Sequence, residues 1–326
     1  MLCITHSSTD PFFNLAAEEY LLHNFHENCF MLWQNENSIV VGKHQNTLAE
    51  INLDFVREKN IKVVRRLSGG GTVFHDLGNL NYTFIIGGQE GRLVNFKKYS
   101  APILEVLQKL NVDAKFQPPN NLVINGEKFS GNAEHIYKNR VLHHGTLLFS
   151  SEIEDLNLAL KVNPFKYKSK AVKSIPSRVT NIREHLKIDI DVTGFKNIIM
   201  DYIMENNPYA SLYEFSIKDI DNINMLKREK YQTWEWNYGY SPEYGFERTF
   251  ITHKGAIRVN LYISGGFIKE AKIQGDFFNR SEVSVLEVSL EGIKHEKPGL
   301  TKKLKSIIFP RCFGHITQEE FIKGLF

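Results

Sequence analysis

Amphipathic helical patterns alternate with short hydrophobic runs along the first half of the chain. Asp10 and Pro11 form an N-cap followed by proline at the first helical position, and the apolar and polar stripes of residues 12–22 predict a helix. Short β-rich runs separated by Asn, Gly and charged turns predict strands at "FMLWQ", "SIVVG", "IKVVRR", "TVFHD" and "LNYTFII". Further patterns predict helices at 49–60 and 100–110, strands between 121 and 149, and a helix capped by Ser151.

The second half of the chain continues this mixture. Helices are predicted at 193–206 and 216–231, the second opened by the capping pair Ser216 and Asp219. An aromatic stretch, "TWEWNYGYSPEYG", leads to strands joined by a Gly-Gly hairpin and to three more helices. The irregular spacing predicts an α+β fold with a mixed, largely antiparallel sheet. We expect a large domain at 1–240, a linker at about 241–247 and a small α+β domain at 248–326.

A basic stretch separates these elements between residues 161 and 187. It carries eight lysines and arginines, two prolines and one acid, Glu184. Such a stretch is commonly a solvated surface. The functional alternative is a positively charged flap over residues 166–178, mobile without a ligand, that meets an anionic ligand or an acidic partner protein. The sequence alone leaves both interpretations open.

Composition restricts the class of protein. The 326 residues, 42% of them hydrophobic, suffice for one large domain with a small one. No stretch has the apolar length of a membrane span and the N-terminus lacks the regions of a secretory signal, so we expect a cytoplasmic protein with no membrane contact. Cys3, Cys29 and Cys312 lack metal-ligand spacing and are expected to be free, buried thiols. A net charge of +3 does not indicate a nucleic-acid-binding protein.

Three adjacent glycines, Gly69 to Gly71, follow two arginines in "RRLSGGGTVFHD". Ordering such a triplet is costly in backbone entropy, and its N–H groups can form a nest that favours phosphate or carboxylate oxygens. Arg65 and Arg66 are adjacent on a predicted strand, so only one of them can share that space. The alternative is that the three glycines only form the end of a hairpin and bind no ligand. Neither the Walker pattern nor the dinucleotide fingerprint is present.

Lys128 stands just beyond a turn in "INGEKFSGNA". One face of this strand is expected to line a cleft, where a lysine is a suitable point charge for a phosphate or for a developing oxyanion. The alternative is a solvated hairpin lysine.

Histidines supply the remaining candidate chemistry. His143 and His144 must point to opposite faces of a strand, so one of them could hydrogen-bond a ligand. Either could instead be a core histidine, and we favour the core position for His143. His75 and Asp76 suggest metal binding or acid–base chemistry, but the spacing provides no third zinc ligand. There is also no nucleophile elbow and no cysteine beside these elements, which argues against a serine or cysteine nucleophile.

The segments "RRLSGGGTVFHDLGNLNYTF", "GEKFSGNA" and "HHGTLLFS" together resemble the lipoate–protein ligase A family. The resemblance extends to "DPFFNLAAEEYLL" and "LWQNENSIVVGKHQN" upstream and to "SIPSRVTNI" and "TWEWNYG" downstream. The small C-terminal domain is similar to that of the bacterial type. Nearly the whole chain is covered, and the related biotin–protein ligases share the fold but not these motifs.

The resemblance implies an AMP-forming ligation in two steps on a catalytic domain of the biotin/lipoate ligase type. Lipoate and ATP would form lipoyl-AMP and pyrophosphate, and a lysine of a lipoyl-domain protein would then take the lipoyl group. Lys128 is the implied catalytic residue. The implied ATP and adenylate contacts are Arg66, Gly71, Thr72, Val73, Phe74 and Lys128. The implied lipoate contacts are Trp33, Gly42, Gly69, Gly70, His75, His144 and Lys128.

The implied partners are lipoyl-domain acceptors, namely 2-oxoacid dehydrogenase E2 subunits and the glycine cleavage H protein, with Mg²⁺ accompanying ATP. A monomer is the default expectation. The chain departs from the family at Pro119, Asn120 and Asn121, where relatives commonly carry an Asp. The amide oxygen of Asn121 is therefore the candidate Mg²⁺ ligand, and it brings no charge.

Three alternatives remain at this point. Animal lipoyltransferases also resemble the chain, including "TWEW" and "SIPS", and use preformed lipoyl-AMP. An octanoyl transferase is disfavoured because a thioester route would require a well-placed cysteine. A non-catalytic binding module would use the basic stretch to hold RNA or an acidic protein, but that stretch contains only Phe165 and Tyr167 as stacking residues.

Overall fold

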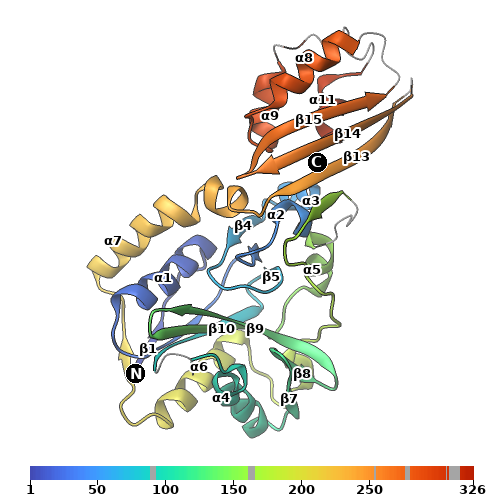
Figure 1. Cartoon of the computed structure of the whole chain (residues 1–326). Coiled ribbons are helices and arrows are strands. Elements are labelled where there is room, and N and C mark those ends of the chain that lie inside the picture. Colours follow the sequence, from blue (N-terminus) through green and yellow to red (C-terminus); the bar gives the residue numbers. More distant parts are fainter. Residues whose placement is uncertain (89–92, 161–165, 253–254, 276–279, 306, 308–315) are drawn as a thin grey trace. The chain divides into compact units, whose positions relative to one another are not determined.

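The structure is a computed structural model of the chain (Figure 1). It describes residues 1–88, 93–160, 166–252, 255–275, 280–305, 307 and 316–326. Cys312 and the start of the basic stretch, 161–165, lie outside the described residues. The chain forms two compact units. The larger unit contains Met1–Lys43, Asp54–Leu160 and Lys173–Thr233, and the smaller unit contains His44–Leu53, Lys161–Val172 and Trp234–Phe326.

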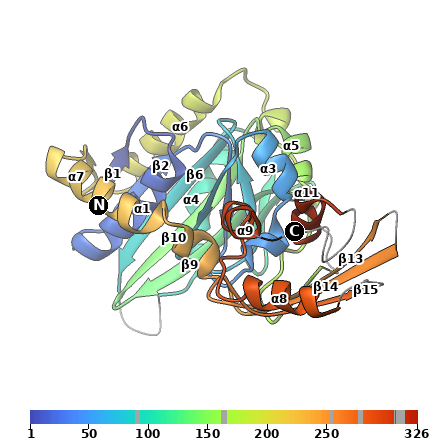
Figure 2. The same ribbon diagram turned by 90° about the horizontal axis from the view of Figure 1, so that it is seen from above.

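An eight-stranded mixed sheet forms the centre of the larger unit, in the order β12-β1-β2-β6-β10-β9-β8-β7. Strand β1 pairs in parallel with β12 and β2, and the remaining neighbours are antiparallel. Figure 2 shows β6, β10 and β9 side by side. The strands are β1 (Leu2–Thr5), β2 (Cys29–Trp33), β6 (Asn79–Gly87), β7 (Ala114–Gln117), β8 (Asn121–Ile124), β9 (Glu127–Tyr137), β10 (Arg140–Leu148) and β12 (Ser211–Tyr213).

Helices cover both faces of this sheet (Figure 1). Helices α4 (Phe96–Lys109) and α6 (Val192–Glu205) bury their apolar side chains with Phe30, Phe84 and other residues of one sheet face to form the main core. Helix α1 (Pro11–Asn24) contacts β6 and β10, and α7 (Ile217–Leu226) packs along α1. The sheet therefore separates an apolar core from a second layer.

A three-stranded sheet completes the larger unit in the order β4-β3-β5. Strand β3 (Ser38–Val41) pairs in parallel with β4 (Lys62–Arg65) and antiparallel with β5 (Val73–His75). The triglycine segment is the connection from β4 to β5. The short elements α3 (Leu53–Glu58), α5 (Ile153–Ala159), η1 (Ile182–His185) and η2 (Lys227–Tyr231) also belong mainly to this unit.

The smaller unit is built on the antiparallel sheet β11-β13-β14-β15. Its core combines this sheet with α8, α9 and α11, and it also takes Leu48 and Tyr167 from earlier parts of the chain. Gly265 and Gly266 have φ of +60° and +78° and form the expected glycine hairpin between β14 and β15. The elements are α2 (Thr47–Glu50), β11 (Tyr167–Ser169), η3 (Glu235–Gly239), β13 (Tyr244–Thr252), β14 (Gly255–Ser264), β15 (Phe267–Gly275), α8 (Arg280–Leu290), α9 (Lys297–Leu304) and α11 (Gln318–Gly324).

The α+β prediction is confirmed, as are two helix starts. Asp10 accepts a hydrogen bond from the Phe12 N–H, and Ser216 forms a capping box with Asp219. Strand β13 begins at Tyr244, inside the expected linker, and the functional division at 1–240 and 248–326 stays a prediction.

Two helix predictions were wrong in detail. The helix expected at 49–60 is split into α2 and α3 because Ile51 takes an extended conformation, φ −123°, and buries its side chain. Ser151 does not cap α5. Its backbone N–H is donated to Asn181 Oδ1, and Glu152 occupies the N-cap position without a side-chain hydrogen bond.

Cys3 and Cys29 are buried free thiols, as expected, and burial raises the pKa of Cys29 to about 11. Within the described ranges, no helix combines the length and apolar character required to cross a bilayer.

Candidate functional site

Strand register decides which side chains share the sheet face turned away from α4 and α6. His144 lies opposite Thr83 across the β10–β6 pair, and Thr83 lies opposite Met31 on β2. Side chains opposite each other in a ladder point to the same face, while neighbours along a strand alternate. His144 and Thr83 therefore share one face, and His143 points into the core, as predicted.

The triglycine loop is folded around the Arg66 side chain. The guanidinium donates through Nη2 to the carbonyl oxygens of Gly69 and Gly71, at 2.6 and 2.8 Å, and through Nη1 to Val40 O at 3.1 Å. Its Nε donates to Ser68 Oγ at 3.0 Å. Four of the five guanidinium N–H groups are thus used within the protein. Arg66 therefore organises the loop, and its expected contact with the adenylate stays a prediction.

Two of the three glycines answer a specific steric demand. Gly70 has φ of +89°, and a Cβ there would lie 3.0 Å from Arg66 Nη2. A Cβ on Gly71 would lie 3.2 Å from Ser174 Oγ, which accepts the Thr72 N–H at 2.9 Å. A Cβ on Gly69 would meet nothing within 4 Å. The loop is therefore more than a hairpin end, because it closes on the protein's own arginine and serine.

Arg65 and Arg66 point in different directions, as adjacent strand residues must. Arg65 is fully buried and donates to the carbonyl oxygens of Gly42 and Lys43, at 2.9 and 3.0 Å. Burial also lowers the pKa of Arg66 to about 10. Gly42, an expected lipoate contact, thus serves as a backbone acceptor for Arg65.

Lys128 lies on the same sheet face as His144. A Cβ built on Gly131 would be 2.9 Å from Lys128 Nζ, so the ammonium occupies the space that a side chain at 131 would take. Its backbone is held on both sides, since the Lys128 N–H is donated to Arg178 O and the Thr180 N–H to Lys128 O, at 2.9 and 3.1 Å.

The electrostatic surroundings of Lys128 disfavour its charge. Burial, and then the positive charge of Arg66, lower the pKa of Lys128 below its ordinary value. Among the described residues, the ammonium has no hydrogen-bond or ion-pair partner. An anion bound here would counter both effects, which is the behaviour expected of an anion-binding lysine.

Asn121 is placed beside this lysine. It lies opposite Gly131 in the β8–β9 pair, so its side chain shares the face of the Lys128 ammonium. Mg²⁺ prefers carboxylate oxygens together with phosphates, but Asn121 offers a neutral amide, and the part of the chain that the structure describes holds no cluster of three His, Cys, Asp or Glu suited to a metal. Asp76 is also engaged, because it accepts the N–H groups of Gly78 and Glu152. These residues do not fit a resident metal ion, so Mg²⁺ would enter as part of the ATP substrate.

Trp33 and His75 form an aromatic wall near the loop. Their rings meet edge to face at 6.2 Å, and Trp33 Nε1 donates to Thr83 Oγ1 at 2.9 Å. Asn35 Nδ2 lies 3.0 Å from His75 Nδ1, which makes Nδ1 the acceptor and leaves the proton on Nε2. Burial and the Arg66 charge lower the pKa of His75 to about 3, and its Nε2 has no partner among the described residues. The neutral His75 ring therefore presents an Nε2–H hydrogen-bond donor within this wall.

The other expected nucleotide contacts lie in or next to β5. Val73 pairs with Val40, the Thr72 N–H meets Ser174, and the Phe74 side chain is buried at 3% exposure. The contacts of these residues with the nucleotide stay predictions.

Sequence reasoning missed Glu18, Ser68 and Thr83, which connect these residues. His144 Nε2 lies 2.6 Å from Ser68 Oγ, and His144 Nδ1 lies 2.9 Å from Glu18 Oε1. Thr83 Oγ1 donates to the same carboxylate at 2.6 Å. Ser68 stood inside the quoted motif, but nothing in the local pattern showed that Glu18 and His144 would meet.

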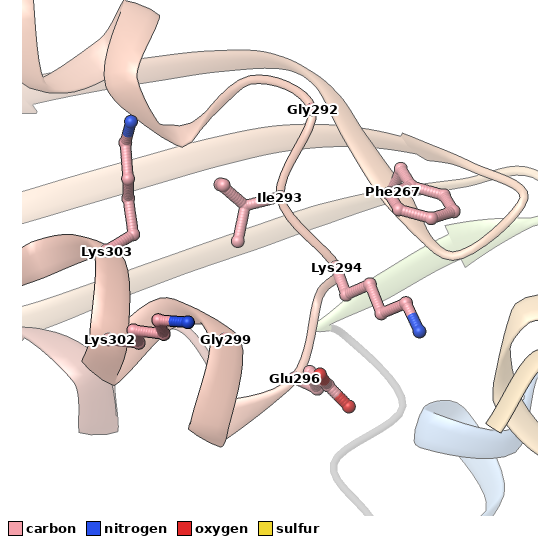
Figure 3. A pocket seen from close by; sticks show the side chains of 8 residues that line it. All are labelled: Phe267, Gly292, Ile293, Lys294, Glu296, Gly299, Lys302 and Lys303. Atoms are coloured by element: carbon pink, nitrogen blue, oxygen red, sulfur yellow. The ribbon is translucent and has the colours of Figure 1, made fainter.

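A separate cavity lies in the smaller unit (Figure 3). Its volume is about 460 Å³, and several lysines surround it. It is lined by Phe267, Gly292, Ile293, Lys294, Glu296, Gly299, Lys302 and Lys303. None of these is an expected site residue, so this cavity is distinct from the face that carries Lys128.

Comparison with known proteins identifies the family of the chain. The model of the lipoyl protein ligase A/B catalytic domain matches residues 10–204, and that of the bacterial lipoate protein ligase C-terminus matches residues 241–325. Lipoate–protein ligase 1 of Staphylococcus aureus is 41% identical over 97% of this chain and 96% of its own length. The lipoate–protein ligase LplJ of Bacillus subtilis is 39% identical over 96% of both chains.

Solved structures show the same fold. The crystal structure of P. falciparum LipL1 in complex with lipoate has a TM-score of 0.62 and 26% identity, covering 99% of this chain and 98% of that one. A lipoate–protein ligase A bound with ATP has a TM-score of 0.63 at 21% identity, covering 73% of this chain and 98% of that one, and supports the fold alone. The protein is an enzyme of the ligase class. The chain belongs to the lipoate–protein ligase family.

Proposed function

We propose that this chain activates lipoate with ATP and attaches the lipoyl group to a lysine of a lipoyl-domain protein. In the first step, a lipoate carboxylate oxygen bonds to the α-phosphorus of ATP, and the bond to the pyrophosphate oxygen breaks. In the second step, an unprotonated acceptor amine attacks the carbonyl carbon of lipoyl-AMP, AMP leaves, and the amine loses a proton as the amide forms. Both steps create anionic charge at one acyl–phosphate junction.

One observation carries the proposal. The Lys128 ammonium is partly buried and has no partner among the described residues. It is also repelled by the positive charge of Arg66, which organises the triglycine loop. A fixed cation aimed where charge develops stabilises the transition state more than the ground state. We assign Lys128 as the catalytic contact to the carboxylate and the α-phosphate. The Gly69–Gly71 loop and Thr72 would supply backbone contacts.

The remaining site residues receive roles on the same basis. Trp33, His75 and His144 would shape the slot for the apolar chain and the dithiolane ring. Gly42, whose carbonyl oxygen accepts from Arg65, would also contact lipoate. Val73 and Phe74 would contact the adenylate through the β5 backbone. Asn121 would orient the triphosphate, whose Mg²⁺ is part of the substrate.

We further infer that the acceptors are E2 subunits of 2-oxoacid dehydrogenases and the glycine cleavage H protein. One related structure is described as an archaeal bipartite ligase together with its E2 lipoyl domain, which supports an acceptor of this kind. A monomer in the cytoplasm stays our prediction, and for the location it rests on the low cysteine count.

Incubating the purified full chain with lipoate, ATP, Mg²⁺ and a lipoyl-domain protein tests the proposal. We expect pyrophosphate, lipoyl-AMP and an acceptor heavier by one lipoyl group, with all three lost in Lys128→Ala. Failure to form either lipoyl-AMP or modified acceptor would overturn the assignment. Modification only when lipoyl-AMP is supplied would identify a lipoyltransferase, which the names of the similar curated proteins do not favour.

A further inference from the structure

Four buried side chains form a continuous hydrogen-bonded row from helix α1 to the triglycine loop. The Glu18 carboxylate lies 2.9 and 3.0 Å from His144 Nδ1, His144 Nε2 lies 2.6 Å from Ser68 Oγ, and Ser68 Oγ accepts from Arg66 Nε at 3.0 Å. Each of the four residues is 7% exposed or less. Water therefore has little opportunity to replace any of these contacts.

With a neutral imidazole, the row has one self-consistent direction. A carboxylate can only accept, so His144 carries its proton on Nδ1 and presents Nε2 as an acceptor. The Ser68 hydroxyl must then donate to His144, and its oxygen accepts from Arg66 Nε, because a guanidinium can only donate. Every proton in the row is assigned, and each points from the loop toward Glu18.

The carboxylate at the end of the row is itself fixed. Thr83 Oγ1 donates to Glu18 Oε1, and Trp33 Nε1 donates to Thr83 Oγ1. Glu18 therefore cannot rotate to follow His144, and the row starts from a rigid anchor on α1 and β6.

The order serine, histidine, carboxylate is also that of an activated nucleophile, but the surroundings oppose this interpretation. Ser68 is 1% exposed, and one of its lone pairs is held by Arg66. Burial leaves almost no surface through which an acyl donor could reach this oxygen. The row is better suited to holding a shape than to making a bond.

We propose that Glu18 and His144 are positioning residues, which act through the Ser68 hydroxyl to hold Arg66 and the triglycine loop in the orientation that ligation requires. This proposal rests on the proposed function. Fixing Nε at Ser68 sets the guanidinium plane, and Nη2 then holds the carbonyl oxygens of Gly69 and Gly71. With those carbonyl groups turned toward the arginine, the loop N–H groups keep one orientation. Small errors in such placement lower rates by about a hundredfold.

The same strand provides a matched control. His143 is also buried and also meets a carboxylate, with Nδ1 2.9 Å from Glu134 Oε1, but it faces the core and has no hydrogen bond to the loop. His143→Gln removes a comparable pair without touching the row.

The test compares Glu18→Gln, Ser68→Ala and the double variant in the full chain, with kcat and KM measured per folded molecule. Each single change should lower kcat about 10- to 100-fold, with much smaller changes in the KM for lipoate and ATP. The double variant should be no slower than Ser68→Ala, because the row is already cut. His143→Gln should keep the wild-type kcat. Single effects that multiply in the double variant, or an unchanged kcat in Glu18→Gln, would overturn the proposal.

A second measurement does not depend on turnover. Nitrogen-15 NMR of His144 should show the Nδ1-protonated tautomer in the wild type and in Ser68→Ala, and an Nε2-protonated ring in the wild type would contradict the row. An inactive wild type would reject the proposed function, whereas an active wild type with multiplying effects would reject only the positioning role.

Discussion

Strand β10 carries two neighbouring histidines, and each meets a buried carboxylate on its own side of the sheet. His143 and Glu134 lie among Tyr82, Tyr99 and Phe96 on the face covered by α4. There Glu134 Oε1 also accepts the Asn95 N–H at 3.3 Å, and Glu134 Oε2 has no partner among the described residues. On the opposite face, His144 and Glu18 continue into the triglycine loop.

The two pairs are alike in chemistry, in burial and in position along the chain. They differ in what the second imidazole nitrogen reaches. His143 Nε2 approaches only the Tyr82 hydroxyl, at 3.4 Å, whereas His144 Nε2 meets Ser68 at 2.6 Å. A buried histidine–carboxylate pair therefore indicates function only when its far end leads to a ligand-facing segment. Four experiments test whether only the loop-facing side of β10 serves the reaction.

Lys128→Ala should have the largest effect, because it removes the cation on the loop-facing side. We expect the rate of lipoyl transfer to fall by about 10³-fold or more, equivalent to about 4 kcal/mol in the barrier, with the stability within about 0.5 kcal/mol of wild type. Single-turnover assays and denaturant unfolding measure the two quantities. Lys115→Ala, at an exposed lysine paired with Asp113, is the matched control. Retained ligation in Lys128→Ala would move the active site elsewhere.

His143→Gln should affect the core face of β10, and it should lower the stability rather than the activity. Removing the imidazole leaves the buried Glu134 carboxylate with only the Asn95 N–H, which costs about 3 kcal/mol of unfolding free energy. The activity per folded molecule should not change. A kcat that falls along with the stability would mean that both faces of β10 serve the reaction.

Gly131→Ala tests the position of the Lys128 ammonium without removing its charge. The new Cβ would lie within 3.0 Å of the flexible end of Lys128, so the ammonium is displaced while the strand remains. We expect activity to fall about 10- to 100-fold, about 1.4–2.7 kcal/mol, with little change in thermal unfolding. Gly87→Ala is the control, since its Cβ would make an ordinary 3.8 Å contact. Equal activity in both variants would show that Lys128 needs no fixed seat.

The smallest effect concerns pH and the neutral His75 on the loop side. Burial lowers its folded pKa to about 3 from an ordinary value of 6.5, so below pH 6.5 the unfolded chain binds a proton that the folded chain does not. Stability is therefore full above pH 6.5 and falls by about 1.4 kcal/mol per pH unit below it. Urea unfolding at pH 7.0 and 5.5 should show that the free energy of unfolding falls by about 1.3 kcal/mol less in His75→Gln than in the wild type, which is a shallower pH slope. An unchanged slope would mean that His75 is already protonated when folded.

The sequence was informative where chemistry is local. The triglycine segment, Lys128 and the division of His143 and His144 between two faces follow from composition and strand alternation. The role of Arg66 did not follow, because folding a loop back onto the preceding arginine is a property of backbone geometry at Gly70. The motif suggested an anion contact, which stays a prediction, and the structure adds the hydrogen bonds from Arg66 to the carbonyl groups of Gly69 and Gly71.

Long-range partners were beyond the reach of pattern analysis. Glu18 appeared to be an ordinary polar position on α1, yet it is 2% exposed because α1 is covered on more than one side. Its meeting with His144 joins positions 126 residues apart. Only the packing of α1 on β6 and β10 brings them together. The split of the helix expected at 49–60 has the same cause, since Ile51 follows tertiary burial rather than helical periodicity.

The path of the chain between its two units determines how the protein can be dissected. The backbone changes unit after Lys43, Leu53, Leu160, Val172 and Thr233. Leu48 and Tyr167 consequently belong to the core of β13, β14 and β15 although they precede those strands by many residues. A gene shortened to end near residue 240 would keep these two side chains and discard most of the core that covers them. Such a fragment would expose apolar side chains and aggregate for reasons unrelated to catalysis. Shortening His44–Leu53 and Lys161–Val172 together with the C-terminal part would avoid this exposure.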